Sequence, residues 1–333
     1  MNAEQCPYGF RVLGSVNEER RLIVATAAFL AHAECDPRAE TDRECYLSAF
    51  CFGDDFRNQL EQRRTTKGFA GSCCSPWLWI DLDGDDLNAT LDNASRLATF
   101  ILSRYPELND DDLLFFFSGS RGFHVGVPLV HRPPPSLHFH LTCRKLAERL
   151  ADDADGIKID TAIYDRVRCF RAPNSKHPKT GLHKRRLRFH EWFNLDAAAI
   201  LSLAREPTPF IIPQPSTVPA LMPSDWQDAA DQAEKRIRER IANYPTGRNE
   251  NGRLQRATLD FMKVGPDVGE RHPRLFRAAA DLTEHGAPPE LVHALLTEAA
   301  LDSGLPPSEV KRQIDCGIEH ARRQGDKSEG GSR

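Results

Sequence analysis

The sequence has no long apolar run, and nothing in its 333 residues approaches the ~20 apolar residues that a membrane-spanning helix needs. Its first residues also lack the basic-then-apolar pattern of a secretory signal. We therefore expect a cytoplasmic protein without a membrane partner. In that compartment its nine cysteines should stay reduced.

Two further absences narrow the function. There is no G-x-x-x-x-G-K-[ST] phosphate loop, which argues against a helicase motor. The cysteines lack the paired C-x-x-C spacing of a structural zinc site, so zinc is not expected. The spacing His138-x-His140-x-x-Cys143 leaves two interpretations open, a partial zinc site with a distant ligand or the start of a helix.

The net charge of −4 hides an uneven distribution of charge. Residues 158–190 contain ten Lys and Arg against two Asp, whereas residues 81–112 are acidic. A basic block beside a carboxylate cluster suits a site that binds polyanions and metal together. A solvated charged surface would show the same counts.

Hydrophobic patterning divides the chain into a mixed region and a helical region. Residues 15–70 are expected to be mainly helical, with an apolar-periodic run from Leu22 to Ala31. Short aromatic and branched runs predict buried strands, and an amphipathic segment between the first two predicts a helix. The strands are expected at 77–83, 113–120 and 123–130, and the helix at 95–105.

Six prolines in residues 206–224 indicate a boundary. Beyond it the pattern is all-helical, and the prolines at 288–290 and 306–309 are placed to open helices. The sequence thus predicts four parts. They are a catalytic domain at 1–203, a linker at 204–224, a helical domain at 225–325 and a disordered tail at 326–333.

Two aspartates end the first expected strand. Asp81 and Asp83 alternate along it, so their side chains should share one face. Adjacent like charges are costly unless a cation lies between them, and Mg²⁺ favours one or two carboxylates with phosphate oxygens and water. The pair therefore predicts a metal site, although an isolated Asp-x-Asp is more often a surface feature.

A glycine-rich turn joins the next two expected strands. Its glycines allow backbone amides to approach an anion, and Ser, Arg and His side chains add donors for phosphate. The alternative is an ordinary hairpin with its histidine in the core. The segment is Ser118-Gly119-Ser120-Arg121-Gly122-Phe123-His124.

A third carboxylate, Asp160, precedes a basic loop that prolines 173 and 178 should hold in a fixed shape. Arginine suits bidentate phosphate contacts and lysine acts as a compact charge. The alternative is an exposed basic loop with Asp160 as a helix cap. The candidate cations are Arg168, Arg171, Lys176, His177 and Lys179.

The order and spacing of these three motifs closely resemble those of the archaeo-eukaryotic primase superfamily, especially the primase-polymerases of phages, plasmids and bacterial defence systems. The match runs from residue 81 to residue 181. Residues 268–321 resemble, more weakly, the helical module that follows many such catalytic domains. One departure is clear: no cysteine lies between Asp83 and Ser118, where many of these primases carry a zinc knuckle.

The resemblance implies an α/β (α+β) fold, with a core of two small α/β units and an active-site cleft between them. One unit would hold a sheet related to the RNA-recognition fold, and an all-α module would follow. It also implies the role of each motif residue. Asp81, Asp83 and Asp160 would bind two Mg²⁺ or Mn²⁺ ions, and Ser118, Gly119, Arg121, Gly122, His124, Arg168, Arg171, Lys176 and Lys179 would hold the nucleotide.

The function that follows is a DNA primase or primase-polymerase, a nucleotidyltransferase that copies single-stranded DNA from NTPs or dNTPs. A replicative helicase or another replication protein is a candidate partner. Two alternatives stay open. One is a gap-filling polymerase that only extends strands, and the other is a non-catalytic replication initiator or defence sensor that binds nucleic acid.

Overall fold

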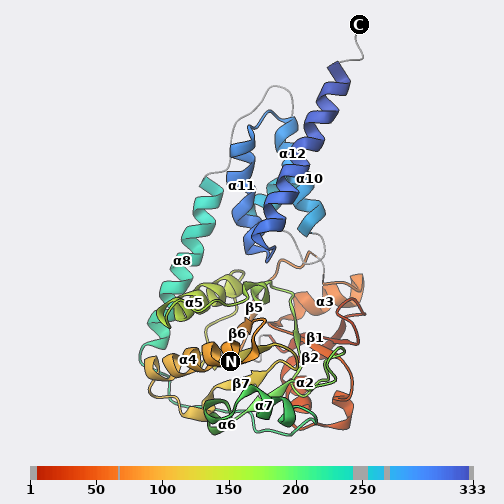
Figure 1. Ribbon diagram of the computed structural model, residues 1–333. Coiled ribbons are helices and arrows are strands. Elements are labelled where there is room, and N and C mark those ends of the chain that lie inside the picture. The colour runs from red at the N-terminus through yellow and green to blue at the C-terminus, as the bar shows by residue number, and fades with distance from the viewer. Residues whose placement is uncertain (1–5, 67, 243–253, 266–270, 330–333) are drawn as a thin grey trace. The chain divides into compact units, whose positions relative to one another are not determined.

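The computed structural model describes residues 6–66, 68–242, 254–265 and 271–329, and it divides into two compact units (Figure 1). Unit 1 extends to Ala233 and unit 2 begins at Glu234. Unit 1 contains two antiparallel sheets with helices, and the described part of unit 2 is helical. The predicted mixed α/β class with a helical C-terminal region is confirmed.

The first sheet contains six strands in the order β5-β4-β1-β3-β9, with β2 paired to β1. All its pairings are antiparallel. Helices α2 (Ala25–Ala33) and α3 (Asp54–Arg63) and the short η1 (Pro37–Ala39) connect its strands. The strands are β1 (Tyr8–Leu13), β2 (Arg21–Val24), β3 (Cys45–Ser48), β4 (Cys51–Phe52), β5 (Cys73–Cys74) and β9 (Cys169–Arg171).

This sheet corrects one prediction, because residues 15–70 are not mainly helical. The run from Leu22 to Val24 pairs with β1, and the helix begins only at Ala25. Branched side chains favour a pleated, half-buried strand, and the neighbouring strand satisfies their backbone groups. The apolar period seen in the sequence therefore mixes a strand with the helix that follows it.

The second sheet has the order β10-β7-β8-β6, and its strands β6, β7 and β8 correspond to the three strands predicted from the sequence, whereas β10 was not predicted. The helix predicted at 95–105 is the last part of α4 (Leu87–Arg104). The strands are β6 (Trp77–Asp83), β7 (Leu114–Phe117), β8 (Gly122–Pro128) and β10 (Arg185–Leu187). The other helices of this region are η2 (Asp110–Asp112), α5 (Phe139–Asp153), η3 (Thr161–Tyr164), α6 (Phe189–Asn194) and α7 (Ala197–Leu203).

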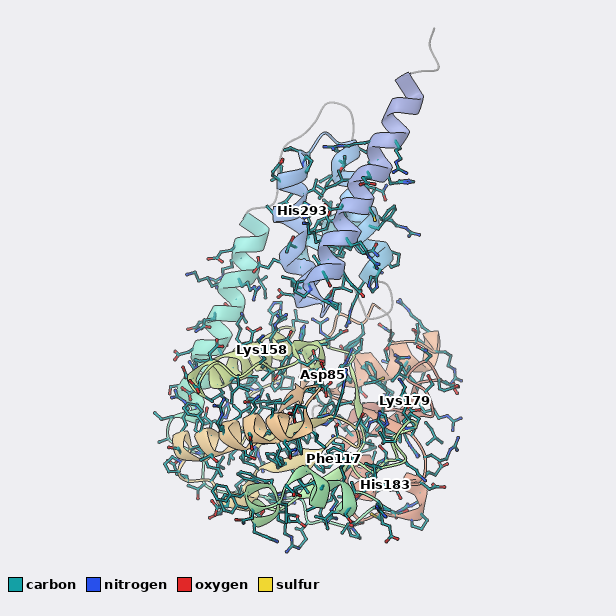
Figure 2. All side chains as sticks on the ribbon, in the orientation of Figure 1. Asp85, Phe117, Lys158, Lys179, His183 and His293 are labelled. Atoms are coloured by element: carbon teal, nitrogen blue, oxygen red, sulfur yellow. The ribbon has the colours of Figure 1, made fainter. Side chains whose placement is uncertain are left out.

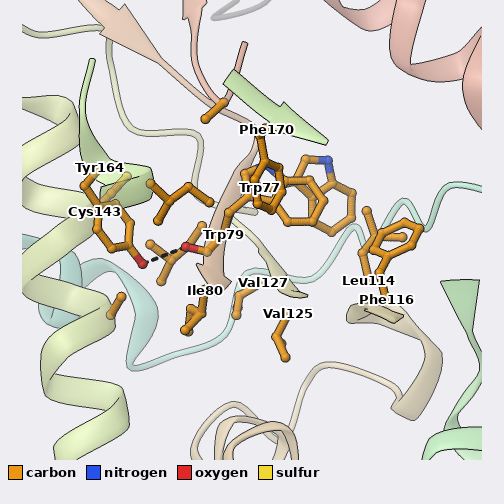
Figure 3. Packing of buried hydrophobic residues seen from close by; sticks show 14 of the residues in the cluster. Trp77, Trp79, Ile80, Leu114, Phe116, Val125, Val127, Cys143, Tyr164 and Phe170 are labelled. Atoms are coloured by element: carbon orange, nitrogen blue, oxygen red, sulfur yellow. Dashed lines mark hydrogen bonds between the residues drawn. The ribbon is translucent and has the colours of Figure 1, made fainter. Parts of the chain in front are cut away.

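The two faces of the second sheet have different roles. On one face, buried aliphatic and aromatic side chains pack under α4 and α6, where Trp192 stacks on Phe115 with centroids 4.9 Å apart. The opposite face turns toward the first sheet, where Phe170 of β9 lies 5.3 Å from Trp79 (Figure 3). The candidate site lies on this second face.

The proline-rich segment runs along unit 1 and leads into α8 (Met222–Ala242). Phe210 meets Phe116 edge-to-face at 5.4 Å. In α8, Asp225 is only 3% exposed and accepts two 2.7 Å hydrogen bonds from Arg104 and one of 2.8 Å from Tyr105. This buried, charge-assisted cluster fastens the first turns of α8 to unit 1.

Unit 2 contains α9 (Arg256–Val264), α10 (Arg271–Glu284), α11 (Pro289–Asp302) and α12 (Pro307–Glu329). The helix starts predicted from the two proline pairs are confirmed at Pro289 and Pro307. Residues 326–329, predicted as part of a disordered tail, belong to α12. Residues 330–333, and residues 268–270 of the C-terminal resemblance, lie outside the described residues. Among the described helices, none has the length and apolar character to cross a bilayer.

Candidate active site

The first two motifs lie side by side on neighbouring strands. The face of β6 that turns toward the first sheet carries Trp77, Trp79, Asp81 and Asp83 at alternate positions. Antiparallel register places Asp81 opposite His124 of β8, and their Oδ1 and Nε2 atoms are 3.4 Å apart. The carboxylate pair and the histidine of the glycine-rich turn therefore share one site.

Asp160 joins this pair through its backbone. Its amide donates a 2.8 Å hydrogen bond to the carbonyl oxygen of Asp81. A few residues later the Tyr164 hydroxyl donates to the carbonyl oxygen of Trp79 at 2.6 Å, the dashed line in Figure 3. The Asp160 side chain also caps η3 by accepting from the Ala162 amide at 2.8 Å. The cap and the place beside Asp81 are thus compatible, although the sequence presented them as alternatives.

Burial and neighbouring carboxylates disfavour the ionised forms of Asp81 and Asp83. Burial, then the charges of Asp83 and Asp160, raise the pKa of Asp81 well above its ordinary value. Partial desolvation and the charge of Asp160 also raise the pKa of Asp83. A divalent cation would remove this repulsion, so the cluster favours metal binding on electrostatic grounds.

Three polar atoms around this site make no hydrogen bond within the described chain: Asp81 Oδ1, His124 Nδ1 and Arg171 Nη1. Buried polar atoms are nearly always satisfied in folded proteins, so a cluster of unsatisfied ones indicates a ligand. Burial, then the charges of Lys184 and Arg171, lower the pKa of His124 well below its ordinary value. His124 is therefore neutral at physiological pH.

The glycine-rich turn is closed by its own hydrogen bonds. The Ser118 amide donates to the Gly122 carbonyl at 2.9 Å, and the Gly122 amide donates to Ser118 Oγ at 3.2 Å. A Cβ on Gly122 would lie 2.1 Å from Asp83 Oδ1, so only glycine lets this carboxylate occupy its place. Gly119 has φ +90°, which also favours glycine.

Arg121 extends from this turn into solvent. Its guanidinium pairs at 3.2 Å with Asp85, whose side chain is fully exposed and which Figure 2 labels. Burial and Asp160 raise the pKa of Asp83, and the positive charge of Arg121 acts against this rise. Arg121 is thus beside the carboxylates but does not enter the buried row of Asp81 and His124.

The two predicted arginines come from the first sheet. Arg171 of β9 lies over the Tyr46 ring at 4.9 Å and donates to the Tyr46 hydroxyl at 3.1 Å. Arg168 precedes β9, and its charge acts against the rise that burial causes in the pKa of Asp81. Phe170, between them in sequence, stacks on the His124 ring at 4.4 Å. The charge of Arg168 therefore acts on Asp81 and that of Arg171 on His124.

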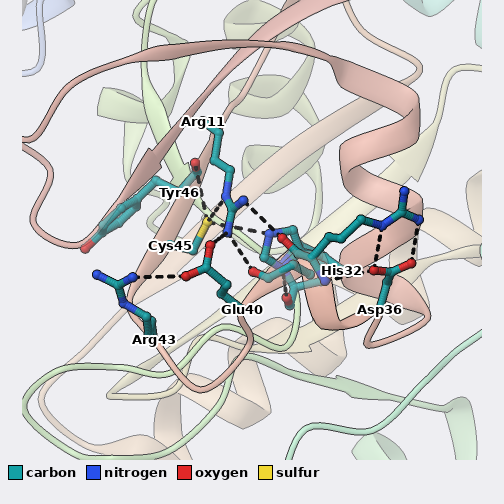
Figure 4. Close-up of polar contacts among 10 residues, drawn as sticks. Arg11, His32, Asp36, Glu40, Arg43, Cys45 and Tyr46 are labelled. Carbon is teal, nitrogen blue, oxygen red and sulfur yellow. Dashed lines mark hydrogen bonds and ion pairs between the residues drawn. The ribbon is translucent and has the colours of Figure 1, made fainter.

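A polar network fixes the loop that follows β9 (Figure 4). His32 of α2 contacts the Pro173 carbonyl oxygen at 3.0 Å and the Cys45 sulfur at 3.5 Å. Arg11 donates to that sulfur at 3.3 Å. The Asn174 amide group donates to the His32 carbonyl oxygen at 2.9 Å. Helix α2 and strands β1 and β3 thereby position the start of the basic loop.

The basic loop then returns to the glycine-rich turn. The Thr180 hydroxyl donates to the Gly119 carbonyl at 2.5 Å. His177 Nδ1 accepts from the amides of Lys179 and Thr180 at 3.3 Å, so the ring proton of His177 resides on Nε2. Lys176 and Lys179 are exposed, and Figure 2 labels Lys179. These two lysines border the site without entering it.

Lys184 is the residue of this site that the sequence did not single out. It is only 1% exposed, and its Nζ lies 4.0 Å from the Phe170 ring centroid and 5.4 Å from that of Trp79. Burial, followed by the charge of Arg171, lowers its pKa well below the ordinary value, and Asp81 acts against this shift. Lys184 begins a run of three cationic residues, Lys184-Arg185-Arg186, and no local pattern tells which of them is buried.

No group of three or more His, Cys, Asp or Glu side chains in the described ranges is arranged to hold a metal ion. The charge of Asp160 nevertheless raises the pKa of both Asp81 and Asp83 after the larger effect of burial, so the three side chains lie near one another. His138 is the residue before α5, while His140 and Cys143 are buried on its first turns. The His-x-His-x-x-Cys spacing is therefore the start of a helix.

Comparison with known proteins gives little more than a coarse likeness. No family model matches the chain, and no curated protein matches it. One solved structure, described as the crystal structure of primase RepB', is similar over 97% of this chain and 96% of its own. The identity is 12% and the TM-score 0.36, so we infer the function from the site itself.

Proposed function

We propose that the chain is a template-dependent nucleotidyltransferase of the primase-polymerase kind. The observation that carries this proposal is the row formed by buried Asp81, neutral His124 and the unsatisfied Arg171, with Asp83 and Asp160 beside it. Carboxylates for metal next to cationic and neutral donors for phosphate are the parts that phosphoryl transfer requires.

Divalent metal fits this site through its carboxylates. Asp81 and Asp83 would hold Mg²⁺ or Mn²⁺ together with phosphate oxygens and water, and Asp160 would supply the third negative charge beside the ions. The unsatisfied Oδ1 of Asp81 supports this assignment. When bound, such ions supply activation of an attacking hydroxyl and charge neutralisation on the leaving pyrophosphate.

The remaining residues would bind and orient the nucleotide. Arg171 offers its free Nη1 to a phosphate oxygen, and Tyr46 holds the guanidinium in place. His124, as a neutral ring, would contact a phosphate without adding a positive charge that would compete with the metal for Asp81. The turn at Gly119, closed against Thr180, places the basic loop where its lysines attract the triphosphate through longer-range charge.

A second candidate is a non-catalytic protein that binds nucleic acid. It is favoured by the absence, in the part of the chain that the structure describes, of a group of three ligands already arranged for metal. In the first candidate, substrate phosphates would complete the coordination. In the second, the basic residues alone would be used.

A primer-synthesis assay separates the two. Single-stranded DNA, with and without an annealed primer, is incubated with labelled dNTPs or NTPs and Mg²⁺ or Mn²⁺, and products are resolved on a gel. We expect metal-dependent products, and the unprimed lanes report initiation. DNA binding without incorporation under any of these conditions would replace the first candidate by the second.

Truncation tests whether the helical region serves initiation. Starting a strand requires two nucleotides to be held at once, so a chain ending at Ala242 should extend a supplied primer and lose initiation on bare template. Ending at Leu203 would be a poorer choice, since it removes Asp225 from Arg104 and Tyr105. If the chain ending at Ala242 still initiated strands, unit 2 would be assigned to partner binding instead. A replicative helicase stays the predicted candidate for that partner.

A further inference from the structure

A cavity of about 730 Å³ lies in unit 1 beside the candidate active site. It covers the half of the β6 face formed by Trp77 and Trp79. Phe29 of α2 and the proline-rich segment around Ile212 form other parts of its wall. Its volume falls within the range of pockets that bind small molecules.

The cavity and the carboxylate site occupy successive halves of the same strand face. Asp81 and Asp83 do not line the cavity, whereas Trp77 and Trp79 do. Lys184 lies at the boundary, above Trp79 and Phe170. Figure 3 shows Trp77, Trp79 and Phe170 gathered at this place. The cavity is therefore separate from the proposed metal site.

The charge of the lining is of one sign. Among the described residues that line the cavity there are three cations, Arg132, Arg171 and Lys184, and no Asp or Glu. The Lys184 ammonium donates to the Arg171 carbonyl oxygen at 2.9 Å and otherwise faces aromatic rings. Within the described ranges no carboxylate lies within ion-pair distance of Lys184, and a buried ammonium without such a partner is costly, so the cavity is complementary to an anion.

The rest of the lining selects an apolar body. Aromatic, aliphatic and proline side chains dominate it, and its few neutral polar groups include Ser48 and Gln214. A nucleobase would bring several ring donors and acceptors into this surface and leave most of them unsatisfied. An alkyl chain or an unsubstituted aryl group loses no hydrogen bonds there and gains from burial.

We propose that this cavity binds a small amphipathic anion, with its alkyl or aryl body against Trp77 and Trp79 and its acidic group on Lys184. The inference goes beyond the proposed function and does not depend on it. The charge of the Lys184 ammonium acts on Asp81. An acidic group bound to Lys184 would offset that charge, and ligand binding in the cavity would therefore affect the carboxylate site.

The selectivity for charge is tested with three ligands of equal chain length: decanoate, decanol and decyltrimethylammonium. Calorimetric titration into the full chain should give an affinity for decanoate at least about tenfold higher than for the other two, because a charged partner of a buried ammonium contributes more than a neutral one. Equal affinities, or no binding of decanoate at millimolar concentration, would overturn the proposal.

The location is tested with tryptophan fluorescence. The chain has four tryptophans, and only Trp77 and Trp79 line the cavity. Decanoate should change the fluorescence of a Trp192→Phe/Trp226→Phe variant and leave that of a Trp77→Phe/Trp79→Phe variant unchanged. The reverse result would place the ligand elsewhere and reject this site.

The role of Lys184 is tested by Lys184→Met, which keeps the side-chain length and removes the charge. Decanoate binding should weaken by about tenfold, while decanol binding should be unchanged. Thermal unfolding of each variant shows whether it is folded before titration. If Lys184→Met does not fold, decanoate titrated into the parent chain against rising salt supplies the measure of charge. Affinity for decanoate that is unchanged by the substitution, or by salt, contradicts the proposed contact.

Discussion

The two halves of the β6 face differ in how completely their side chains are satisfied. Trp79 packs against the rings of Trp77, Phe29, Phe116 and Phe170, and the Tyr164 hydroxyl donates to the Trp79 carbonyl oxygen. Two residues after Trp79, Asp81 has a buried oxygen that makes no hydrogen bond within the described part of the chain, and it lies near two other carboxylates. One strand therefore carries a stabilising half and a half that is unfavourable without ligand.

This difference shows how a strained site is tolerated. Residues of one strand share a continuous backbone. The unfavourable carboxylates are therefore held in position by the packing of the aromatic half of β6. Proteins commonly keep such destabilised clusters at functional sites and compensate for them elsewhere. Substitutions in the two halves should accordingly have opposite signatures in activity and stability.

The largest expected effect is on catalysis by the carboxylate half. Asp83→Ala should reduce nucleotide incorporation by about a thousandfold or more, because it removes a ligand that acts on the transition state. Its unfolding temperature should be unchanged, or higher without metal, since a repelling charge is lost. Near-normal incorporation with Mg²⁺ or Mn²⁺ would contradict the proposed catalytic role.

Substitutions in the aromatic half should mainly lower the stability of the fold. Trp79→Ala should lower the free energy of unfolding by about 3–5 kcal/mol, because it leaves a void among Phe29, Phe116 and Phe170. Denaturant unfolding measures this, with Trp79→Phe as the conservative control, which should lose less. A loss below about 1 kcal/mol would mean that this half does not hold the strand in place.

Nucleotide capture should depend on burial of the contacting group. Arg171→Ala and His124→Ala should raise KM for the triphosphate by about tenfold or more and change template affinity little. Lys179→Ala, an exposed neighbour, should raise KM only at low salt, because solvent and ions screen its charge. Loss of template affinity with an unchanged nucleotide KM would reassign Arg171 and His124.

The smallest effect is the pH dependence of stability. The pKa of Asp81 is higher in the folded than in the unfolded chain, so the folded state loses stability as pH rises from about 4 through the folded pKa, then levels off. Asp81→Asn has no such charge. Its unfolding temperature should exceed that of the parent by a few degrees, increasingly with pH. If Asp81→Asn and the parent chain had equal melting temperatures at both acid and neutral pH, Asp81 would not be destabilising.

The sequence by itself determined the elements that local chemistry specifies. The strand 77–83, the glycine-rich turn and the helix starts at Pro289 and Pro307 follow from alternation, turn residues and fixed proline geometry. The three motifs also supplied the candidate residues, of which the structure brings Asp81, Asp83, His124 and Asp160 together. Their chemical roles stay predictions until they are measured.

Only the tertiary structure decided what depends on distant partners. Leu22–Val24 is a strand because β1 lies beside it. Asp160 lies beside Asp81 because its backbone amide donates a hydrogen bond to the Asp81 carbonyl oxygen. Lys184 is buried among aromatic rings from three different strands, although its sequence neighbours carry the same charge. The physical reason is the same in each case. Burial and the pKa shifts it causes depend on contacts between residues far apart in the chain, which a local pattern does not contain.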